Sequence, residues 1–278
     1  MKKAVVFIII LTIIILTLIL TSQKILDMTT STIETEIVTN SFFPNDLSSY
    51  QKSRIAHGGG SLDGYTYSSS YDAVKYYYNK GIRLFELDVE YTSDHMPVML
   101  HSWDGFQYKY LGIDRDIVCT YDEFINAEMI NGWTQLTLDS TIRIMKTEFP
   151  EMLLITDTKE DNKELLLILS TLYSDLMDRI IPQVYNQDEY KYAKELGFKN
   201  IIYTLYMSED TDDQIIDFCT LNKPFAITMP KSRALESDLA TRLSDMGIYV
   251  YAHTVNEEAE FEELKEKGVQ GIYTDTLM

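Results

Sequence analysis

Short runs of β-branched and other apolar residues alternate with amphipathic stretches of helical length from Ser53 to the end of the chain. This alternation is typical of a parallel sheet that is covered by helices. An α/β domain made of consecutive βα units is therefore predicted. Eight of the runs have the length and composition of strands: Arg54–His57, Arg83–Val89, Leu153–Asp157, Ile180–Val184, Asn200–Leu205, Phe225–Met229, Tyr249–His253 and Gly271–Thr274.

The stretches between these runs have the pattern of helices. Gly197, Gly247 and Gly268 each follow one of them directly, at the position where a left-handed C-cap favours glycine. Eight strands separated by helices predict a closed (β/α)8 barrel, the TIM-barrel fold. The predicted helices are Ser70–Asn79, Leu138–Glu148, Asn162–Leu176, Asp188–Leu196, Asp212–Leu221, Glu236–Asp245 and Glu257–Lys267.

An open, doubly wound sheet is the alternative fold for such a pattern. It normally carries a glycine-rich nucleotide-binding turn between its first strand and a helix. The run from His57 to Gly60 is rich in glycine, but it does not match G-x-G-x-x-G and does not lead straight into a helix. The closed barrel is therefore favoured. Met96–Asn131 does not fit one βα unit, so Pro97–His101 is expected to form an extra strand that an inserted loop follows.

The N-terminal residues predict a membrane anchor. Ala4–Leu20 is apolar except for two threonines, and Lys2 and Lys3 precede it. Because no A-x-A-like cleavage site follows, an uncleaved anchor is favoured over a cleaved signal peptide. The lysines favour a cytoplasmic N-terminus and an extracellular body. The predicted organisation is a transmembrane signal anchor at 1–21, a Ser/Thr-rich spacer at 22–52 and the barrel at 53–278, which predicts a single-pass protein of the cell membrane.

The charge of the chain limits its partners. Among its 278 residues, 24 are Lys or Arg and 43 are Asp or Glu, which gives a formal net charge of −19. Such a field repels nucleic acid and anionic lipid surfaces, so no nucleic-acid partner is expected. An anionic substrate would need a local cation, either a metal ion or a well-placed basic side chain. Of the two cysteines, Cys219 lies at helical spacing from apolar residues and is expected to be a buried free thiol.

Three acidic residues are candidates for a metal site, because reactive groups of a barrel lie at the C-terminal ends of its strands. Glu86 and Asp88 are two positions apart on a strand, so their side chains project to the same face. Asp157 ends the neighbouring strand. Three carboxylates that converge at one mouth would form an oxygen site for a hard divalent ion, Ca²⁺ or Mg²⁺. The alternative is that Glu86 and Asp88 face solvent or pair with Arg83.

Two histidines lie beside this predicted metal site. His57 ends the first strand, and His101 ends the extra strand. Two histidines at neighbouring strand ends suit general acid–base catalysis near neutral pH. His95 lies in a turn and is expected to be exposed and without a role. His253 ends the seventh strand, where packing is slightly favoured over a position in the pocket.

Taken together, these motifs resemble the core of the glycerophosphodiester phosphodiesterase family, from about Ser53 to the C-terminus. The resemblance implies a (β/α)8 barrel, one divalent cation and hydrolysis of a phosphodiester such as a glycerophosphodiester or a phospholipid. By position, it implies an acid–base pair of His57 and His101, metal ligands Glu86, Asp88 and Asp157, and a phosphate contact from Lys159. The motifs that carry it are Ala56–Gly60, Phe85–Val89, Thr92–Asp94, Pro97–His101, Asp157–Lys159, Thr254–Asn256 and Gly268–Asp275.

The chain departs from the family's pattern at several positions. The family usually has an arginine directly after the first histidine, where this chain has Gly58. Backbone N–H groups of Gly58 and Gly59 are expected to form an anion-binding nest in its place. Asp157 stands where the family has glutamate, and His253 stands where it often has tryptophan.

These departures leave two alternatives to the hydrolase prediction. One is a non-catalytic module at the cell surface that binds phosphate-containing polymers. The other is a phospholipase or lyase like sphingomyelinase D, a related barrel family that also combines two histidines with a three-carboxylate metal site. Because the chain retains both histidines and all three acidic positions, a phosphodiesterase that acts on a small phosphodiester, a phospholipid or a polyol-phosphate polymer is favoured.

Overall fold

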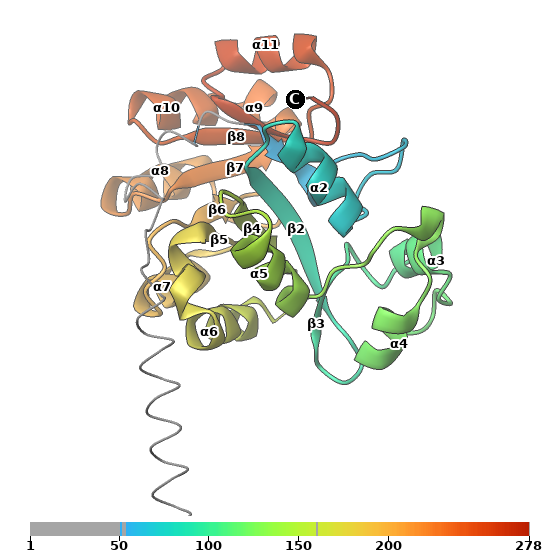
Figure 1. Cartoon of the computed structure of the whole chain (residues 1–278). Helices are drawn as coiled ribbons and strands as arrows, with labels where there is room; N and C mark the ends of the chain where they lie inside the picture. The colour runs from blue at the N-terminus through green and yellow to red at the C-terminus, as the bar shows by residue number, and fades with distance from the viewer. Residues whose placement is uncertain (1–50, 52–53, 160, 278) are drawn as a thin grey trace, which may run out of the picture. The chain divides into compact units, whose positions relative to one another are not determined.

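A computed structural model describes residue 51 and residues 54–159 and 161–277. Eight parallel strands close into a barrel, because the last strand pairs with the first and the first pairs with the second (Figure 1). The predicted barrel and all eight of its predicted strands are thereby confirmed. In order around the barrel, the strands are β1 (Ile55–Ala56), β2 (Leu84–Tyr91), β4 (Leu153–Asp157), β5 (Ile180–Val184), β6 (Ile202–Thr204), β7 (Ala226–Pro230), β8 (Val250–His253) and β9 (Gly271–Thr274).

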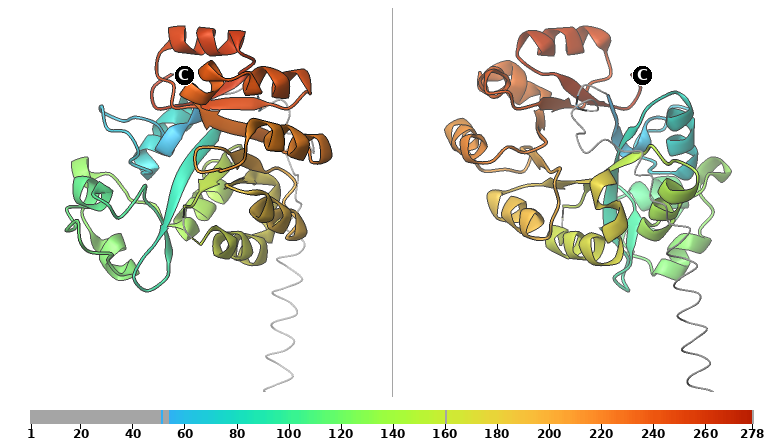
Figure 2. Two further views of the ribbon diagram at one scale, coloured as in Figure 1. Left: turned by 180° about the vertical axis from the view of Figure 1, so that it is seen from behind. Right: turned by 60° about the vertical axis from the view of Figure 1, so that its left-hand side comes forward.

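Helices surround the barrel, as the views in Figure 2 show. Each predicted helix is present, although the one expected to reach Leu176 ends at Leu172 and continues as a 3-10 helix, η4 (Ser174–Arg179). The helices are α2 (Tyr71–Asn79), α5 (Leu138–Thr147), α6 (Asn162–Leu172), α7 (Gln187–Glu195), α8 (Asp212–Leu221), α9 (Lys231–Glu236), α10 (Leu239–Asp245) and α11 (Glu258–Glu266).

Local sequence fixes where these helices begin and end. The side chain of Thr211 accepts a hydrogen bond from the Gln214 N–H, and the Gln214 side chain accepts one from the Thr211 N–H, which closes a capping box at the start of α8. The three glycines expected at helix C-caps all have positive φ angles, of 98°, 73° and 94° for Gly197, Gly247 and Gly268. These caps turn each helix back toward the next strand.

An insertion extends the barrel beside β2. Strand β2 has eight residues and extends beyond the part that pairs with its barrel neighbours. Its end pairs antiparallel with β3 (Pro97–Met99), which confirms the extra strand. The region expected to be a loop contains α3 (Phe106–Leu111) and α4 (Tyr121–Asn126), which Figure 1 places beside β3. The insertion has a small core of its own, formed by Val98, Leu100, Tyr110, Leu111, Cys119, Phe124 and Met129.

In the part of the chain that the structure describes, no helix has the length and apolar character needed to cross a bilayer. The predicted anchor at 1–21 lies outside the described residues, as does the predicted spacer at 22–52 except for Gln51. Both cysteines are buried free thiols, as expected for Cys219.

Candidate active site

The three acidic residues converge at the C-terminal mouth of the barrel. Asp88 on β2 lies opposite Asp157 on β4 in the parallel register, and Glu86 precedes Asp88 by two positions. Each of the three offers an oxygen atom, and these atoms lie within 4.8 Å of one another. All three are buried, with 1%, 4% and 9% of Glu86, Asp88 and Asp157 exposed. Arg83 pairs with Glu151 at 2.9 Å, so the alternative of a solvent-facing or Arg83-bound pair does not apply.

The described residues around these three carboxylates do not supply enough positive charge to balance them. Burial, together with the charges of Asp88 and Asp157, raises the pKa of Glu86 well above its ordinary value. Burial and Asp88 raise the pKa of Asp157 to about 7. Glu86 Oε1 and Asp88 Oδ2 are buried and have no hydrogen-bond partner among the described residues. Such unpaired oxygens are costly, and a hard divalent cation such as Mg²⁺ or Ca²⁺ would satisfy them, so the donor set fits this kind of ion.

The glycine run after β1 supports Glu86. The Gly58 N–H donates to Glu86 Oε2 at 2.8 Å, and the Gly60 N–H donates to the His57 carbonyl oxygen at 2.9 Å. Two of the three N–H groups of the run are therefore already used within the protein. Gly58, which was expected to belong to an anion-binding nest, instead orients one of the candidate metal ligands.

Two tyrosines that the sequence did not indicate hold Asp157. The Tyr185 hydroxyl donates to Asp157 Oδ1, and the Tyr206 hydroxyl lies 3.4 Å from Oδ2. The two hydroxyls are 3.0 Å apart. Tyr185 directly follows β5 and Tyr206 lies two residues beyond β6, so both come from the same rim of the barrel as the acids. These contacts orient the side chain of Asp157.

His57 has a carboxylate partner. Its Nδ1 lies 3.0 Å from Asp275 Oδ1, and Asn256 Nδ2 donates to Asp275 Oδ2 at 2.8 Å. A carboxylate at Nδ1 favours a proton on that nitrogen, which leaves Nε2 for the cavity that His57 lines. Asp275 therefore fixes the tautomer of the ring. The residue lies in a motif at the C-terminus that the sequence associated with the family, but no role was predicted for it.

His101 lies in a more apolar setting. Its ring centroid is 4.3 Å from that of Phe106, in the insertion, and 4.7 Å from that of Tyr67. Burial lowers the pKa of His101, and its Nδ1 has no hydrogen-bond partner in the described part of the chain. The two histidines thus differ in their surroundings, because His57 has a carboxylate at its Nδ1 and His101 does not.

Lys159 is the cation nearest to the acidic residues in the described chain. Its Nζ donates to Asp88 Oδ1 at 3.3 Å and to the His101 carbonyl oxygen at 3.2 Å. Burial alone would lower the pKa of Lys159, but the charges of Asp88 and Asp157 outweigh burial and raise it. Lys159 is therefore positively charged at neutral pH.

One cavity of about 330 Å³ brings the predicted residues together. His253 also lines it, and its Nδ1 lies 3.0 Å from Thr228 Oγ1. Burial lowers the pKa of His253 to about 3, so this ring is neutral. His95 is exposed in its turn, as predicted. The predicted residues that line the cavity are His57, Glu86, Asp88, His101, Asp157 and Lys159.

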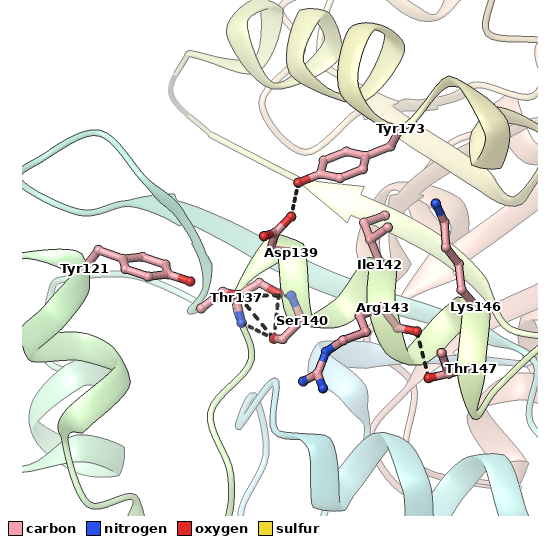
Figure 3. Close-up of a pocket in the computed structure, with 9 residues that line it drawn as sticks. All are labelled: Tyr121, Thr137, Asp139, Ser140, Ile142, Arg143, Lys146, Thr147 and Tyr173. Atoms are coloured by element: carbon pink, nitrogen blue, oxygen red, sulfur yellow. Dashed lines mark hydrogen bonds between the residues drawn. The ribbon is translucent and has the colours of Figure 1, made fainter. Parts of the chain in front are cut away.

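A second hollow of about 480 Å³ lies on the outer face of α5 (Figure 3). There the Tyr173 hydroxyl donates to Asp139, while the exposed side chains of Arg143 and Lys146 point in different directions. This hollow contains no histidine and no cluster of acidic residues. The cavity at the barrel mouth is therefore the candidate active site.

A barrel that gathers two histidines, a lysine and three buried carboxylates at its mouth has the groups that a metal-dependent hydrolase of anionic substrates would use. Residues 103–277 match the model of the glycerophosphoryl diester phosphodiesterase family. Because the match covers more than half of the chain, the chain belongs to this family and is a phosphodiesterase. The matched range begins after four of the candidate catalytic and metal-binding residues, so their assignment rests on the geometry above. These four are His57, Glu86, Asp88 and His101.

Solved structures show the same fold. A glycerophosphodiester phosphodiesterase from Parabacteroides distasonis is similar with a TM-score of 0.63 and 23% identity, over 80% of this chain and 91% of that one. One from Thermotoga maritima has a TM-score of 0.61 and 17% identity, over 80% and 93%. A phosphodiesterase from Oleispira antarctica, in complex with the product sn-glycerol-3-phosphate, has a TM-score of 0.61 and 17% identity, over 84% and 94%. No curated protein sequence matches the chain.

Proposed function

We propose that the chain hydrolyses a glycerophosphodiester, a phospholipid or a polyol phosphate with the help of one divalent cation and a pair of histidines. The observation that carries this proposal is the single cavity that His57 and His101 share with Lys159 and the three carboxylates. Membership of the phosphodiesterase family supports the same class of substrate. Binding alone would not require an acid–base pair beside a metal site.

Three carboxylates would hold the cation, namely Glu86, Asp88 and Asp157. When bound, Ca²⁺ or Mg²⁺ supplies positive charge that stabilises the charge on the phosphoryl oxygens. Lys159, whose Nζ lies 3.3 Å from Asp88 Oδ1, adds a second positive charge. Gly58, Tyr185 and Tyr206 keep two of the carboxylates in place.

The histidines would transfer protons. One ring removes a proton from the nucleophile, which is water or a neighbouring hydroxyl of the substrate, and the other gives a proton to the leaving oxygen. Burial favours the neutral form of His101, which suits the role of base. His57, whose Nδ1 lies 3.0 Å from Asp275, then serves as the acid. A bell-shaped dependence of rate on pH follows from these opposite protonation states.

The cell-surface location also belongs to this proposal. The lysines and the apolar run at the N-terminus support an anchor with the barrel outside the cell. Protease added to intact cells is expected to remove the barrel and leave a short membrane-bound fragment. A barrel that stays fully protected in intact cells would exclude this orientation.

A hydrolysis screen tests the activity. The protein is assayed with Mg²⁺ or Ca²⁺ on glycerophosphodiesters, lysophospholipids and polyol-phosphate polymers. We expect cleavage of at least one of these substrates, and we expect a chelator and Asp88→Asn each to abolish it. Absence of cleavage of every phosphodiester with either ion would refute the proposed activity.

A further inference from the structure

We propose that Tyr67 binds the substrate directly, by donating its hydroxyl proton to an oxygen of the phosphodiester between the two histidines. This inference rests on the proposed function and adds a specificity-determining residue to it. No motif in the sequence indicated Tyr67. Four features of the structure lead to it.

The backbone places Tyr67 against the turn that carries His57. Gly58 has a φ of +54°, and a Cβ atom there would lie 2.7 Å from Tyr67 Cα. The Ser69 N–H donates to the Gly58 carbonyl oxygen at 3.0 Å, which ties the two segments together. Tyr67 itself has a φ of 61°, a value that bulky residues avoid. Unfavourable backbone conformations of this kind cluster at functional sites.

The ring lies between the two candidate acid–base groups. Its centroid is 4.6 Å from that of His57 and 4.7 Å from that of His101, and both contacts are edge-on. Tyr67 lines the same cavity as both histidines. A phosphodiester that both histidines can reach must therefore lie beside this ring.

The Tyr67 hydroxyl can donate a hydrogen bond to a ligand in the cavity. Burial, followed by the charge of Asp275, raises the pKa of Tyr67 to about 12, so the proton stays in place at neutral pH. The nearby Thr254 hydroxyl, which lies 3.2 Å from His57 Nδ1, opposes the rise. No hydrogen bond found among the described residues takes the Tyr67 proton, so it is available to a ligand.

The charges of the site explain why a neutral donor suits a phosphodiester. Glu86, Asp88 and Asp157 carry three negative charges, which one divalent cation and Lys159 balance. A diester brings one negative charge, whereas a phosphomonoester product brings up to two, because its second pKa is near 6. A tyrosine hydroxyl can donate a hydrogen bond to an oxygen of the diester or of the monoester without adding positive charge to the site. The site therefore favours the diester substrate and releases the monoester product readily.

Tyr67→Phe is the direct test, because it removes the hydroxyl and keeps the ring. Loss of one hydrogen bond to a charged group should lower kcat/KM for a glycerophosphodiester about tenfold or more, mainly through KM. The affinity for Mg²⁺ or Ca²⁺ and the thermal unfolding temperature should not change. Tyr65→Phe is the matched control, because the ring of Tyr65 contacts Tyr110 and Trp133 in the insertion.

Binding of a non-hydrolysable phosphonate diester separates this inference from the proposed activity. Calorimetry with Mg²⁺ present should show an affinity for the phosphonate about tenfold lower in Tyr67→Phe than in the unmodified protein. That result would support the contact even if no diester were cleaved. Equal affinity in the two proteins, or a loss of phosphonate binding that merely follows a loss of metal binding, would overturn it.

Discussion

Replacing Asp157 by asparagine tests whether the acidic residues repel one another in the absence of a metal ion. Asparagine keeps the shape of the side chain and the acceptor for Tyr185, but it removes the charge. The pKa of Asp157 is about 7 in the folded protein against an ordinary value of 3.8, a difference of about three units. At 1.36 kcal/mol per unit, the charged form costs at most about 4 kcal/mol of folding free energy.

The sign of the effect depends on pH. Between the two pKa values of Asp157 the folded protein binds more protons than the unfolded chain, so its stability falls as the pH rises from about 4 to about 7. Without metal, Asp157→Asn should therefore be more stable than the unmodified protein at about pH 8, and the two should be similar at about pH 4. Excess Mg²⁺ or Ca²⁺ should reverse the order at the higher pH, because the unmodified protein gains binding energy.

Urea denaturation at both pH values, with a chelator and with each ion, measures these differences. Asp139→Asn serves as the control, because Asp139 is an exposed acidic residue outside the barrel mouth. A gain in stability that is equal at both pH values would show that the charge of Asp157 does not destabilise the folded protein. A gain that persists in excess metal would show that it is not a ligand.

Other substitutions test the remaining parts of the site. His57→Ala and His101→Ala should each lower kcat on the order of 10²-fold or more, and His95→Ala should leave it unchanged; near-normal turnover in both active-site variants would refute the acid–base assignment. Asp275→Asn should lower kcat on the order of 10²-fold at nearly constant KM and alter the pH–rate profile, because an amide does not favour a proton on Nδ1; a change in KM alone would contradict a positioning role. Gly60→Ala should lower the free energy of unfolding by more than about 1 kcal/mol in denaturant titrations, because φ is +91° and the new Cβ would lie 2.5 Å from the Tyr77 ring; unchanged stability would show that the turn adapts.

The barrel could be predicted because its information is local and repeated. Each βα unit contains an apolar run, an amphipathic stretch and often a glycine at the helix end, and these features do not depend on distant contacts. The convergence of the acids follows from the same features. Glu86 and Asp88 share a face because side chains alternate along a strand, and Asp157 lies beside Asp88 because consecutive parallel strands of a barrel are neighbours.

The short helices of the insertion could not be predicted in the same way. With six residues each, α3 and α4 are too short to be stable alone and depend on the small core around Tyr110 and Phe124. Helix α9 is equally short and follows directly from β7. These short helices form because they pack against the rest of the protein, and the local sequence pattern does not reveal those contacts.

The supporting residues of the site were missed for a related reason. Tyr67, Tyr185 and Tyr206 lie in loops, and 20 tyrosines in the chain give no local sign of which ones reach the mouth. The positive φ of Tyr67 is also hidden, because such a conformation is expected of glycine. The N–H groups of Gly58 and Gly59 were expected to bind an anion, but a buried carboxylate, Glu86, takes the N–H group of Gly58.

The charge at the barrel mouth links metal binding to the chemistry of the substrate. Without an ion, burial favours protonated Glu86 and holds a proton on Asp157 below about pH 7, which leaves Asp88 paired with Lys159. A divalent cation held by the three carboxylates would displace those protons and restore all three negative charges, so the sum of charges would stay near zero in both states. With the ion bound, the positive charge would be concentrated at the three carboxylates, where it would supply electrostatic stabilisation to a phosphoryl oxygen. On a chain whose net charge of −19 repels anions, that concentration of positive charge would make a phosphodiester an acceptable ligand.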